Sequence, residues 1–127
     1  MGGFFDSMRR VFKGRQKDRF SVTGKAIVII APSTDNEKRV QILDISKGGL
    51  AFVYDGSKEE LIESGIMKLM AENETFLEKV HFETASDIPL ENESGYFRRR
   101  GVRFKWMGVF DQAKLDDFIN DVRTCSL

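Results

Sequence analysis

The sequence has very few of the residues that most often carry catalysis or bind metals. It contains one cysteine, Cys125, and one histidine, His81, among 127 residues. A lone cysteine cannot form a disulfide within the chain and offers a metal no second thiolate. His81 has only Glu83 as a close acid, so we expect an ordinary strand residue rather than a metal ligand or a base. No P-loop spacing and no serine with a partner histidine is present. The sequence predicts a protein that is not an enzyme, with no metal and no cofactor.

Long hydrophobic runs are also missing. The longest apolar stretch, residues 26–32, is far shorter than a membrane span, which needs roughly 20 residues. The N-terminus lacks the apolar core and small-residue cleavage site of a secretory signal. The chain is 41% hydrophobic and 31% charged. This is the composition of one globular domain. We therefore expect a cytoplasmic protein without stable membrane insertion.

The net charge is zero, but the charges are unevenly distributed. Residues 1–25 contain seven Lys/Arg and two acids, and residues 98–105 contain five Lys/Arg and no acid. The rest of the chain is acidic. Two basic stretches in an acidic chain can meet on one anion-binding face, or each can simply be a solvated run of charges. For Arg98, Arg99 and Arg100, alternation along a strand would leave at least one facing the barrel surface near other groups, but we favour solvated strand charges.

The hydrophobic pattern is mostly that of β-strands. Alternation and β-branched runs predict strands at residues 20–31, 39–45, 49–55 and 96–109, and two strands within 66–86 around a polar turn at 72–74. In the last strand, Phe97, Val102, Phe104 and Trp106 are expected to face the core, with a bulge or close backbone approach at Gly101. Residues 86–95 are expected to be a loop.

Two helices are expected among these strands. Ser57 with Glu60 has capping-box spacing and Gly65 is a stop signal, so a short helix is predicted over 57–65, although residues 62–72 could also be helical. Behind Asp111 as a cap, the chain should close with an amphipathic helix whose apolar residues are Ala113, Leu115, Phe118, Ile119 and Val122. About six strands followed by one helix predict a closed barrel with the helix over one mouth.

The segment "LDISKGGLAF" at residues 43–52 places several groups suited to ligand binding at the end of a strand. Asp44 and Ser46 are two apart and should point to one side of the sheet. Gly48 and Gly49 permit positive φ, so that backbone N–H groups can converge on a ligand. The same residues would equally serve a tight turn, in which Asp and Ser bond the local backbone.

Arg15 and Arg19, in "GRQKDRF", lie four residues apart and should face one way. A guanidinium group can grip a phosphate with two hydrogen bonds, bind the O6 and N7 atoms of guanine, or stack on a purine. Asp44 could accept hydrogen bonds from guanine N1–H and its amino group. The ligand that complements this set is a guanine nucleotide with exposed phosphates.

The order and spacing of these motifs resemble the two-part signature of PilZ domains. "RQKDR" matches R-x-x-x-R, "DISKGG" matches D-x-S-x-x-G, and "GVRF" at 101–104 is similar to the last barrel strand of that family. The resemblance covers about residues 13–123. It implies a bacterial cyclic di-GMP receptor, built as a six-stranded antiparallel barrel with helices packed on it. It further implies that Arg15 and Arg19 clamp guanine and phosphate, and that Asp44, Ser46 and Gly49 contact the other edge of the ligand.

Residues 1–13 form a segment of their own before the barrel domain of residues 14–127. Phe4, Met8, Val11 and Phe12 fall at helical spacing, beside Arg9 and Arg10. The segment either packs on the barrel or docks on a partner protein or, as a weak anchor, on a membrane surface. Arg9 or Arg10 is a candidate second contact to a ligand phosphate. A ligand that orders the arginines would move this segment and so act as a switch.

Two other functions stay open on the sequence. "RGVRFKWM" is distantly similar to the basic and aromatic pattern of RNA-binding sheets, which suggests a small RNA- or single-strand-binding barrel. The acidic remainder of the chain opposes a long polyanion, and DNA is not expected as a partner. The third possibility is a PilZ-like interaction module that binds no ligand.

Overall fold

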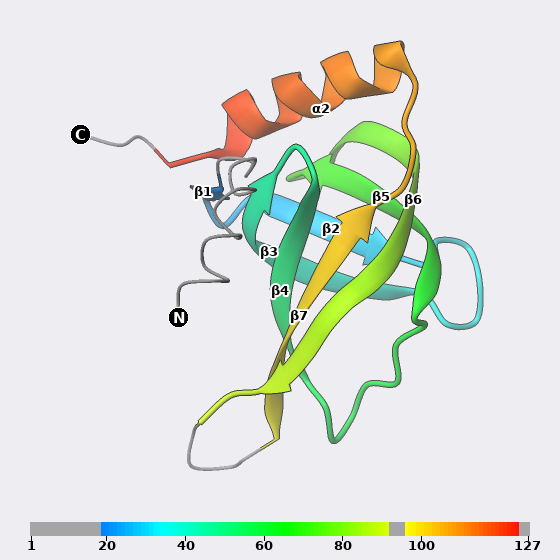
Figure 1. The fold of residues 1–127 in the computed structure, drawn as a ribbon, viewed down its shortest axis with the longest axis vertical. Helices are drawn as coiled ribbons and strands as arrows, with labels where there is room; N and C mark the ends of the chain where they lie inside the picture. The colour runs from blue at the N-terminus through cyan, green and yellow to red at the C-terminus, as the bar shows by residue number, and fades with distance from the viewer. Residues whose placement is uncertain (1–18, 92–95, 125–127) are drawn as a thin grey trace, which may run out of the picture.

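A computed structural model of the chain describes residues 19–91 and 96–124. These residues are mainly β, and the helix among them lies at the C-terminal end (Figure 1). In chain order its elements are β1 (Phe20–Ser21), β2 (Ala26–Ile30), β3 (Lys38–Ser46), β4 (Gly49–Asp55), β5 (Ser64–Ala71), β6 (Glu74–Pro89), β7 (Phe97–Phe104) and α2 (Val109–Val122). No helix in these residues is both long and apolar enough to cross a bilayer.

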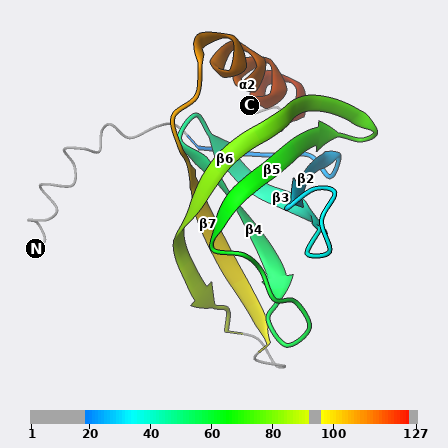
Figure 2. The ribbon, with the colours of Figure 1, turned by 90° about the vertical axis from the view of Figure 1, so that its right-hand side faces the viewer.

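The strands form a closed antiparallel barrel. Their order is β1-β3-β2-β5-β6-β7-β4, and a further pairing of β3 with β4 closes the ring. Strands β2 to β7 make the six-stranded barrel, and the two-residue β1 adds to the end of β3 through pairs of Phe20 with Ile45 and Ser21 with Asp44. Helix α2 lies across one end (Figure 2). The expected fold, a six-stranded antiparallel barrel with a C-terminal helix, is confirmed.

The core lies inside the barrel and under the helix. Each strand of the barrel contributes apolar residues from its inner face, and the fully buried side chains include Val28, Ile45, Leu50, Phe52, Met67, Leu69, Val80 and Phe82. Helix α2 covers them with Leu115, Phe118, Ile119 and Val122, and the ring centres of Phe118 and Phe76 are 5.4 Å apart. The predicted amphipathic face of the helix is confirmed except at Ala113, which is exposed.

The predicted short helix over 57–65 is wrong. Asp55 caps a turn there, because its carboxylate accepts hydrogen bonds from the backbone N–H and the hydroxyl of Ser57. Residues 59–62 have no regular structure, and β5 begins at Ser64. The helical alternative for residues 62–72 is also wrong, because Met67, Leu69 and Ala71 are buried at a period of two residues. The polar turn between β5 and β6 is confirmed.

Several strand boundaries also differ from the prediction. The expected first strand is divided into β1 and β2 by residues 22–25, which contain a turn at residues 24–25. The expected loop over 86–95 is in part strand, since β6 reaches Pro89 by pairing with β7. Strand β7 ends at Phe104, so Trp106 is outside the core and 86% exposed, and Phe97 is 41% exposed. Helix α2 begins at Val109 with Gly108 as its N-cap, ahead of the predicted Asp111.

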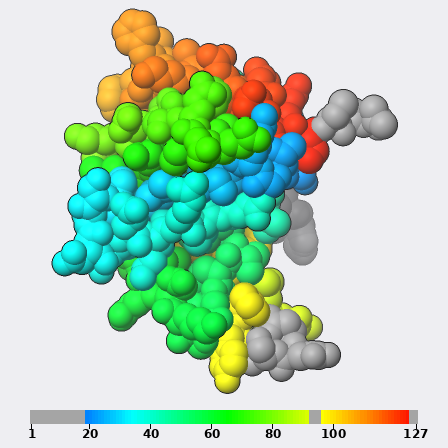
Figure 3. All heavy atoms as spheres, turned by 180° about the vertical axis from the view of Figure 1, so that it is seen from behind, coloured from blue at the N-terminus to red at the C-terminus, as the bar shows by residue number. Residues whose placement is uncertain are grey.

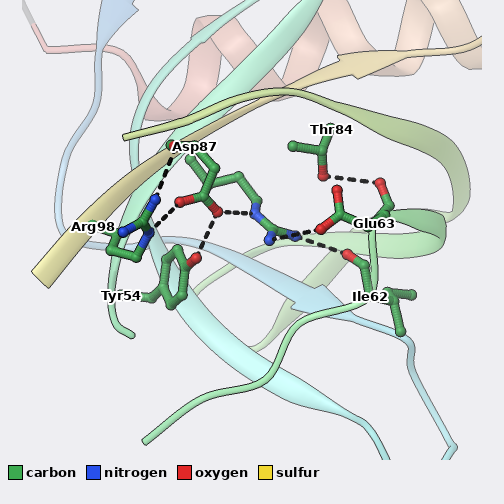
Figure 4. A network of polar contacts seen from close by, with 7 residues as sticks. Tyr54, Ile62, Glu63, Thr84, Asp87 and Arg98 are labelled. Carbon is green, nitrogen blue, oxygen red and sulfur yellow. Dashed lines mark hydrogen bonds and ion pairs between the residues drawn. The ribbon is translucent and has the colours of Figure 1, made fainter. Parts of the chain in front are cut away.

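A buried arginine of β7 contacts β6 and the segment that precedes β5. Arg100 is 5% exposed, and its Nε donates to Asp87 Oδ2 at 2.7 Å while Nη1 donates to the Ile62 carbonyl at 2.8 Å. Asp87 also accepts from Arg98 Nε at 2.6 Å and from the Tyr54 hydroxyl at 2.5 Å (Figure 4). Arg98 and Arg100 are therefore tied into this network, and the prediction that they are solvated strand charges is wrong.

We predict that Asp87→Asn lowers the free energy of unfolding by about 3 kcal/mol, because it leaves the buried Arg100 guanidinium without its charged partner. Glu63→Gln is the matched control. Glu63 also approaches Arg100, at 3.5 Å, but its side chain is 78% exposed. Because this pair is exposed, we expect Glu63→Gln to change the free energy of unfolding by less than about 1 kcal/mol. Urea unfolding at neutral pH measures both. Equal effects of the two substitutions would contradict the assigned role of Asp87.

The same network predicts a pH dependence of stability. Burial alone would raise the pKa of Asp87, but hydrogen bonds from Tyr54, Arg98 and Arg100 outweigh it and hold the pKa below its ordinary value. The unfolded chain then binds more protons near pH 4, so this contribution to stability is present above about pH 4 and is lost as the pH falls further. Asp87→Asn should lack that contribution. Unfolding free energies of the two proteins should therefore converge as the pH is lowered from about 5 to about 3.

Candidate anion-binding site

The site lies on the outer face of β3, β4 and β7, at the end next to α2. Asp44 pairs with Ala51 and Ser46 pairs with Gly49, so the two predicted site residues lie on the same face of the sheet. A register shift between Ile42 and Asp44 resets the alternation just before them. Asp44 and Ser46 therefore lie on the face opposite to the buried Ile45.

Asp44 is held between two arginines that are far apart in the sequence. Its Oδ1 accepts from Arg19 Nε at 2.9 Å and Nη2 at 2.6 Å, and its Oδ2 accepts from Arg99 Nη2 at 2.9 Å. The pairing of β1 with the end of β3 brings Arg19 here, and β7 brings Arg99. The Asp44 side chain is 20% exposed, against 46% for Arg19 and 33% for Arg99. Two cations thus surround one carboxylate at the surface.

Ser46 and the two glycines form the turn between β3 and β4. The Ser46 hydroxyl accepts from the Gly48 N–H at 3.2 Å and lies 3.4 Å from the Gly49 carbonyl, to which it donates. The tight-turn alternative is therefore correct for Ser46, which is 1% exposed. The expectation of positive φ is wrong, because neither glycine adopts it.

Glycine is required at position 49 for a different reason: the backbones of β4 and β7 lie very close together there. A Cβ atom at this position would collide with the Val102 carbonyl oxygen, which no side chain could tolerate. The bare Gly49 lets β4 lie tightly against β7. On the other side of β7, Gly101 is paired with Ser86, directly after a register shift in β6, and a Cβ there would be 3.0 Å from the Ser86 hydroxyl. This agrees with the bulge or close approach predicted at Gly101.

A shallow hollow of about 550 Å³ lies beside these residues. Its walls are Arg19, Ser46, Gly48, Gly49, Ala85, Val102 and Arg103. Small residues make its floor, so a planar group could approach the sheet closely. Arg103 stands at its edge and is paired with Glu83 at 2.9 Å, with 59% of its side chain exposed. The hollow therefore combines an accessible floor with cationic walls.

The structure brings five of the sequence-predicted site residues to this one place: Arg19, Asp44, Ser46, Gly48 and Gly49. Arg15 and the secondary candidates Arg9 and Arg10 lie outside the described residues. Arg99 and Arg103 were missed as site residues. The signal was the alternation in "RRRGVRF", since residues 99, 101 and 103 share one face of a strand while Arg100 and Val102 point inward.

These groups suit an anionic ligand that also carries hydrogen-bond donors. Arg19, Arg99 and Arg103 can bind phosphate oxygens or a purine edge, and Asp44 can accept from N–H groups. Within residues 19–91 and 96–124, no group of three or more His, Cys, Asp or Glu side chains could hold a metal ion. The site can bind and orient a ligand through charge and hydrogen bonds.

Comparison with known proteins identifies the fold. No protein-family model and no curated protein matches the sequence. Among solved structures, the K. pneumonia MrkH–c-di-GMP complex matches at 18% identity with a TM-score of 0.64, over 84% of this chain and 51% of that one. YcgR from Escherichia coli in complex with c-di-GMP matches at 17% identity with a TM-score of 0.62, over 84% of this chain and 45% of that one. This chain therefore spans about half the length of either protein.

A shorter structure matches over most of both chains. It is the PilZ domain of YcgR from Escherichia coli with c-di-GMP, at 13% identity and a TM-score of 0.61, and the match covers 85% of this chain and 90% of that one. The likeness is one of fold. It confirms the fold expected from the motifs, and this chain has the architecture of a PilZ domain.

We predict that Gly49→Ala destabilises the protein by about 3 kcal/mol, because the added methyl group meets a backbone carbonyl that cannot rotate away. Gly48→Ala is the matched control in the same turn. Gly48 has ordinary φ and lies in the turn, ahead of the close contact between β4 and β7. For this control we expect a loss of less than about 0.5 kcal/mol. Urea unfolding of the two variants provides the comparison, and similar losses would contradict the close approach.

Proposed function

We propose that this chain, which has the fold of a PilZ domain, is a receptor for cyclic di-GMP and not an enzyme. The observation that carries the proposal is the meeting of Arg19 with Asp44, beside the hollow formed by Ser46, Gly48 and Gly49. These residues belong to the two motifs that resemble the PilZ signature, and they come from separate parts of the chain. The c-di-GMP complexes of MrkH and YcgR, which share the fold, support the same ligand class.

Binding would proceed as an exchange of partners. Asp44 already accepts three hydrogen bonds from arginines, so a guanine can use its carboxylate only if Arg19 turns away. Arg19 then becomes available to a phosphate or to the guanine edge, together with Arg15. Arg99 keeps its hold on Asp44 Oδ2 and orients the carboxylate. Hydrogen bonds to charged groups contribute about 1.5 to 3 kcal/mol each. Several of them could therefore supply a micromolar affinity, which corresponds to about 8 kcal/mol, after the cost of ordering the segment.

The proposed output is a movement of the segment before the barrel. Arg19 is joined directly to residues 1–18, so a ligand that turns Arg19 also redirects the chain that precedes it. A receptor of this kind, placed in the bacterial cytoplasm, would pass the signal to a protein partner that controls motility, biofilm or polysaccharide production. No further cofactor is part of this mechanism.

The proposal is tested by titration calorimetry with cyclic di-GMP. We expect saturable binding, weakened at least about tenfold, or about 1.4 kcal/mol, in each of Arg15→Ala, Arg19→Ala and Asp44→Ala. All three free proteins should melt at nearly the same temperature as the unchanged protein, and for Arg19 and Asp44 the reason is that their ion pair is at the surface. Arg39→Ala, which removes an exposed arginine from the other end of β3, is the matched control and should bind normally. Unchanged affinity in all three site variants would reject the site.

A short RNA in the same calorimeter distinguishes the alternatives. Binding of the RNA without binding of the dinucleotide would favour an RNA-binding barrel, for which the basic face of β7 is the motivation. Binding of neither would favour a PilZ-like interaction module without a ligand. Either result would overturn the receptor proposal.

Hydrogen exchange tests the movement separately. We predict that cyclic di-GMP slows amide exchange around Arg15 and Arg19, because hydrogen bonds to the ligand order this part of the backbone. Exchange in β2, which lies away from the site, should not change and serves as the internal control. Equal exchange around Arg15 with and without ligand would contradict the switch, even if calorimetry shows binding.

A further inference from the structure

A second hollow adjoins the candidate site at the turn between β3 and β4. It has a volume of about 380 Å³, and Gly48 borders both hollows. The Gly48 carbonyl accepts the Phe104 N–H at 2.9 Å, which holds the turn against the end of β7. Because Gly48 has no side chain, a ligand in the candidate site can extend over the turn into the second hollow.

The second hollow combines apolar walls with exposed charges. Three residues of its lining pack in or against the core of the barrel: Phe104, Met107 and Leu115. Lys47, Lys105 and Asp116 add two cations and one acid. Ligand pockets are typically built in this way, with mostly apolar walls and a few polar groups that orient the ligand. The excess of cations suits an anionic ligand.

Trp106 borders this hollow and stands in solvent. It is 86% exposed, and the start of α2, which follows it, stands out from the surface in the space-filling view (Figure 3). The backbone of the neighbouring Lys105 is fixed, because its N–H donates to the His81 carbonyl at 2.8 Å. An exposed indole ring offers a nucleobase a surface for stacking, and a lysine beside it can bind the phosphate of the same nucleotide.

Both the candidate site and the second hollow hold a carboxylate that is paired with an exposed cation. In the candidate site Asp44 is paired with Arg19, and in the second hollow Asp116 Oδ1 lies 3.6 Å from Lys47 Nζ. The side chains of Lys47 and Asp116 are 67% and 46% exposed, so this pair is weak enough to open for a ligand. Cyclic di-GMP consists of two identical guanine nucleotides. Two similar sets of groups that adjoin each other match a ligand with two similar halves.

We propose that the second hollow binds the second nucleotide of the same cyclic di-GMP molecule. This inference rests on the proposed function, because it concerns the other half of that ligand. Trp106 stacks on the guanine, Lys105 binds a phosphate, and Asp116 accepts hydrogen bonds from the guanine N1–H and amino group. The binding site thus extends beyond the two motifs that resemble the PilZ signature, to the residues after β7 and to α2.

The choice of occupant follows from what the candidate site lacks. A single exposed tryptophan needs no explanation of its own, but Trp106 lies beside a cationic hollow next to that site. Asp44 can accept the N–H groups of one guanine edge only, so the other guanine needs an acceptor of its own. Asp116 is the acid in the lining of the adjoining hollow. These groups therefore favour a second nucleotide over a simple anion.

Trp106 is the only tryptophan in the chain, so its fluorescence reports directly on this hollow. We expect cyclic di-GMP to quench the Trp106 emission with the same midpoint as the calorimetric titration, because the guanine lies against the indole ring. Trp106→Ala should weaken binding about tenfold, which is within the range for the loss of one base–aromatic stack. Trp106→Phe should recover part of this loss, since an aromatic ring remains. Because Trp106 is exposed, both variants should melt at the temperature of the unchanged protein.

Two further variants test the polar contacts. Lys105→Ala should weaken binding about threefold at low salt, and the difference should shrink as salt is added, because ions screen an exposed phosphate contact. Asp116→Asn should weaken binding about tenfold, because its amide group faces the N–H donors of the guanine. Phe110→Ala and Lys114→Ala are the matched controls. They remove an exposed ring and an exposed amine of α2 that border neither hollow, and both should bind normally.

The outcomes separate this inference from the proposed function. Binding that depends on Arg19, with unchanged Trp106 fluorescence and unchanged affinity in Trp106→Ala, would overturn the inference and leave the receptor proposal in place. A stoichiometry of two ligands per chain, with one lost in Trp106→Ala, would show a separate ligand in the second hollow and would also overturn it. The absence of any binding of cyclic di-GMP would reject the receptor proposal and this inference together.

Discussion

The two-residue period of β7 is the constraint on which most of this structure depends. Side chains of a strand alternate between the two faces of a sheet, so "RRRGVRF" cannot place its arginines together. Arg100 turns inward, where it meets Asp87, and Arg99 and Arg103 turn outward to the candidate site. One short basic run therefore supplies both a buried structural contact and the cationic wall of a binding surface.

The held carboxylate of Asp44 changes how ligand recognition should be understood. The acceptor is already satisfied by Arg19 and Arg99, so it has no unpaired charge waiting for a guanine. A ligand gains only the difference between its own hydrogen bonds and those it displaces. Such a site favours a ligand that offers a substitute for both partners, an anion for Arg19 and an N–H donor for Asp44. A simple phosphate offers only the first.

The sequence predicted the barrel well because strand alternation and turn residues are local signals. Residues 49–55 and the two strands around residues 72–74 follow directly from them. The helix expected at Ser57 failed because Asp55, two residues earlier, captures the Ser57 amide and hydroxyl in a turn. Alternation in the sequence indicates that Arg99 faces outward, but its partner Asp44, 55 positions away, follows only from the register of β7 against β4. Trp106 was wrongly expected in the core because a large apolar ring favours burial. The residue at which β7 ends depends on its pairing with other strands, which the local pattern does not show.

The first and last described residues of the chain contact each other. Val22 forms a bridge with Arg123, Thr124 donates its N–H to the Ser21 carbonyl at 2.9 Å, and the Arg123 guanidinium lies 5.1 Å from the centre of the Phe20 ring. Whatever is attached before Phe20 and after Thr124 must leave the domain from the same edge, close to Asp44. The first and last described residues therefore share one anchor on the barrel, beside the carboxylate that holds Arg19.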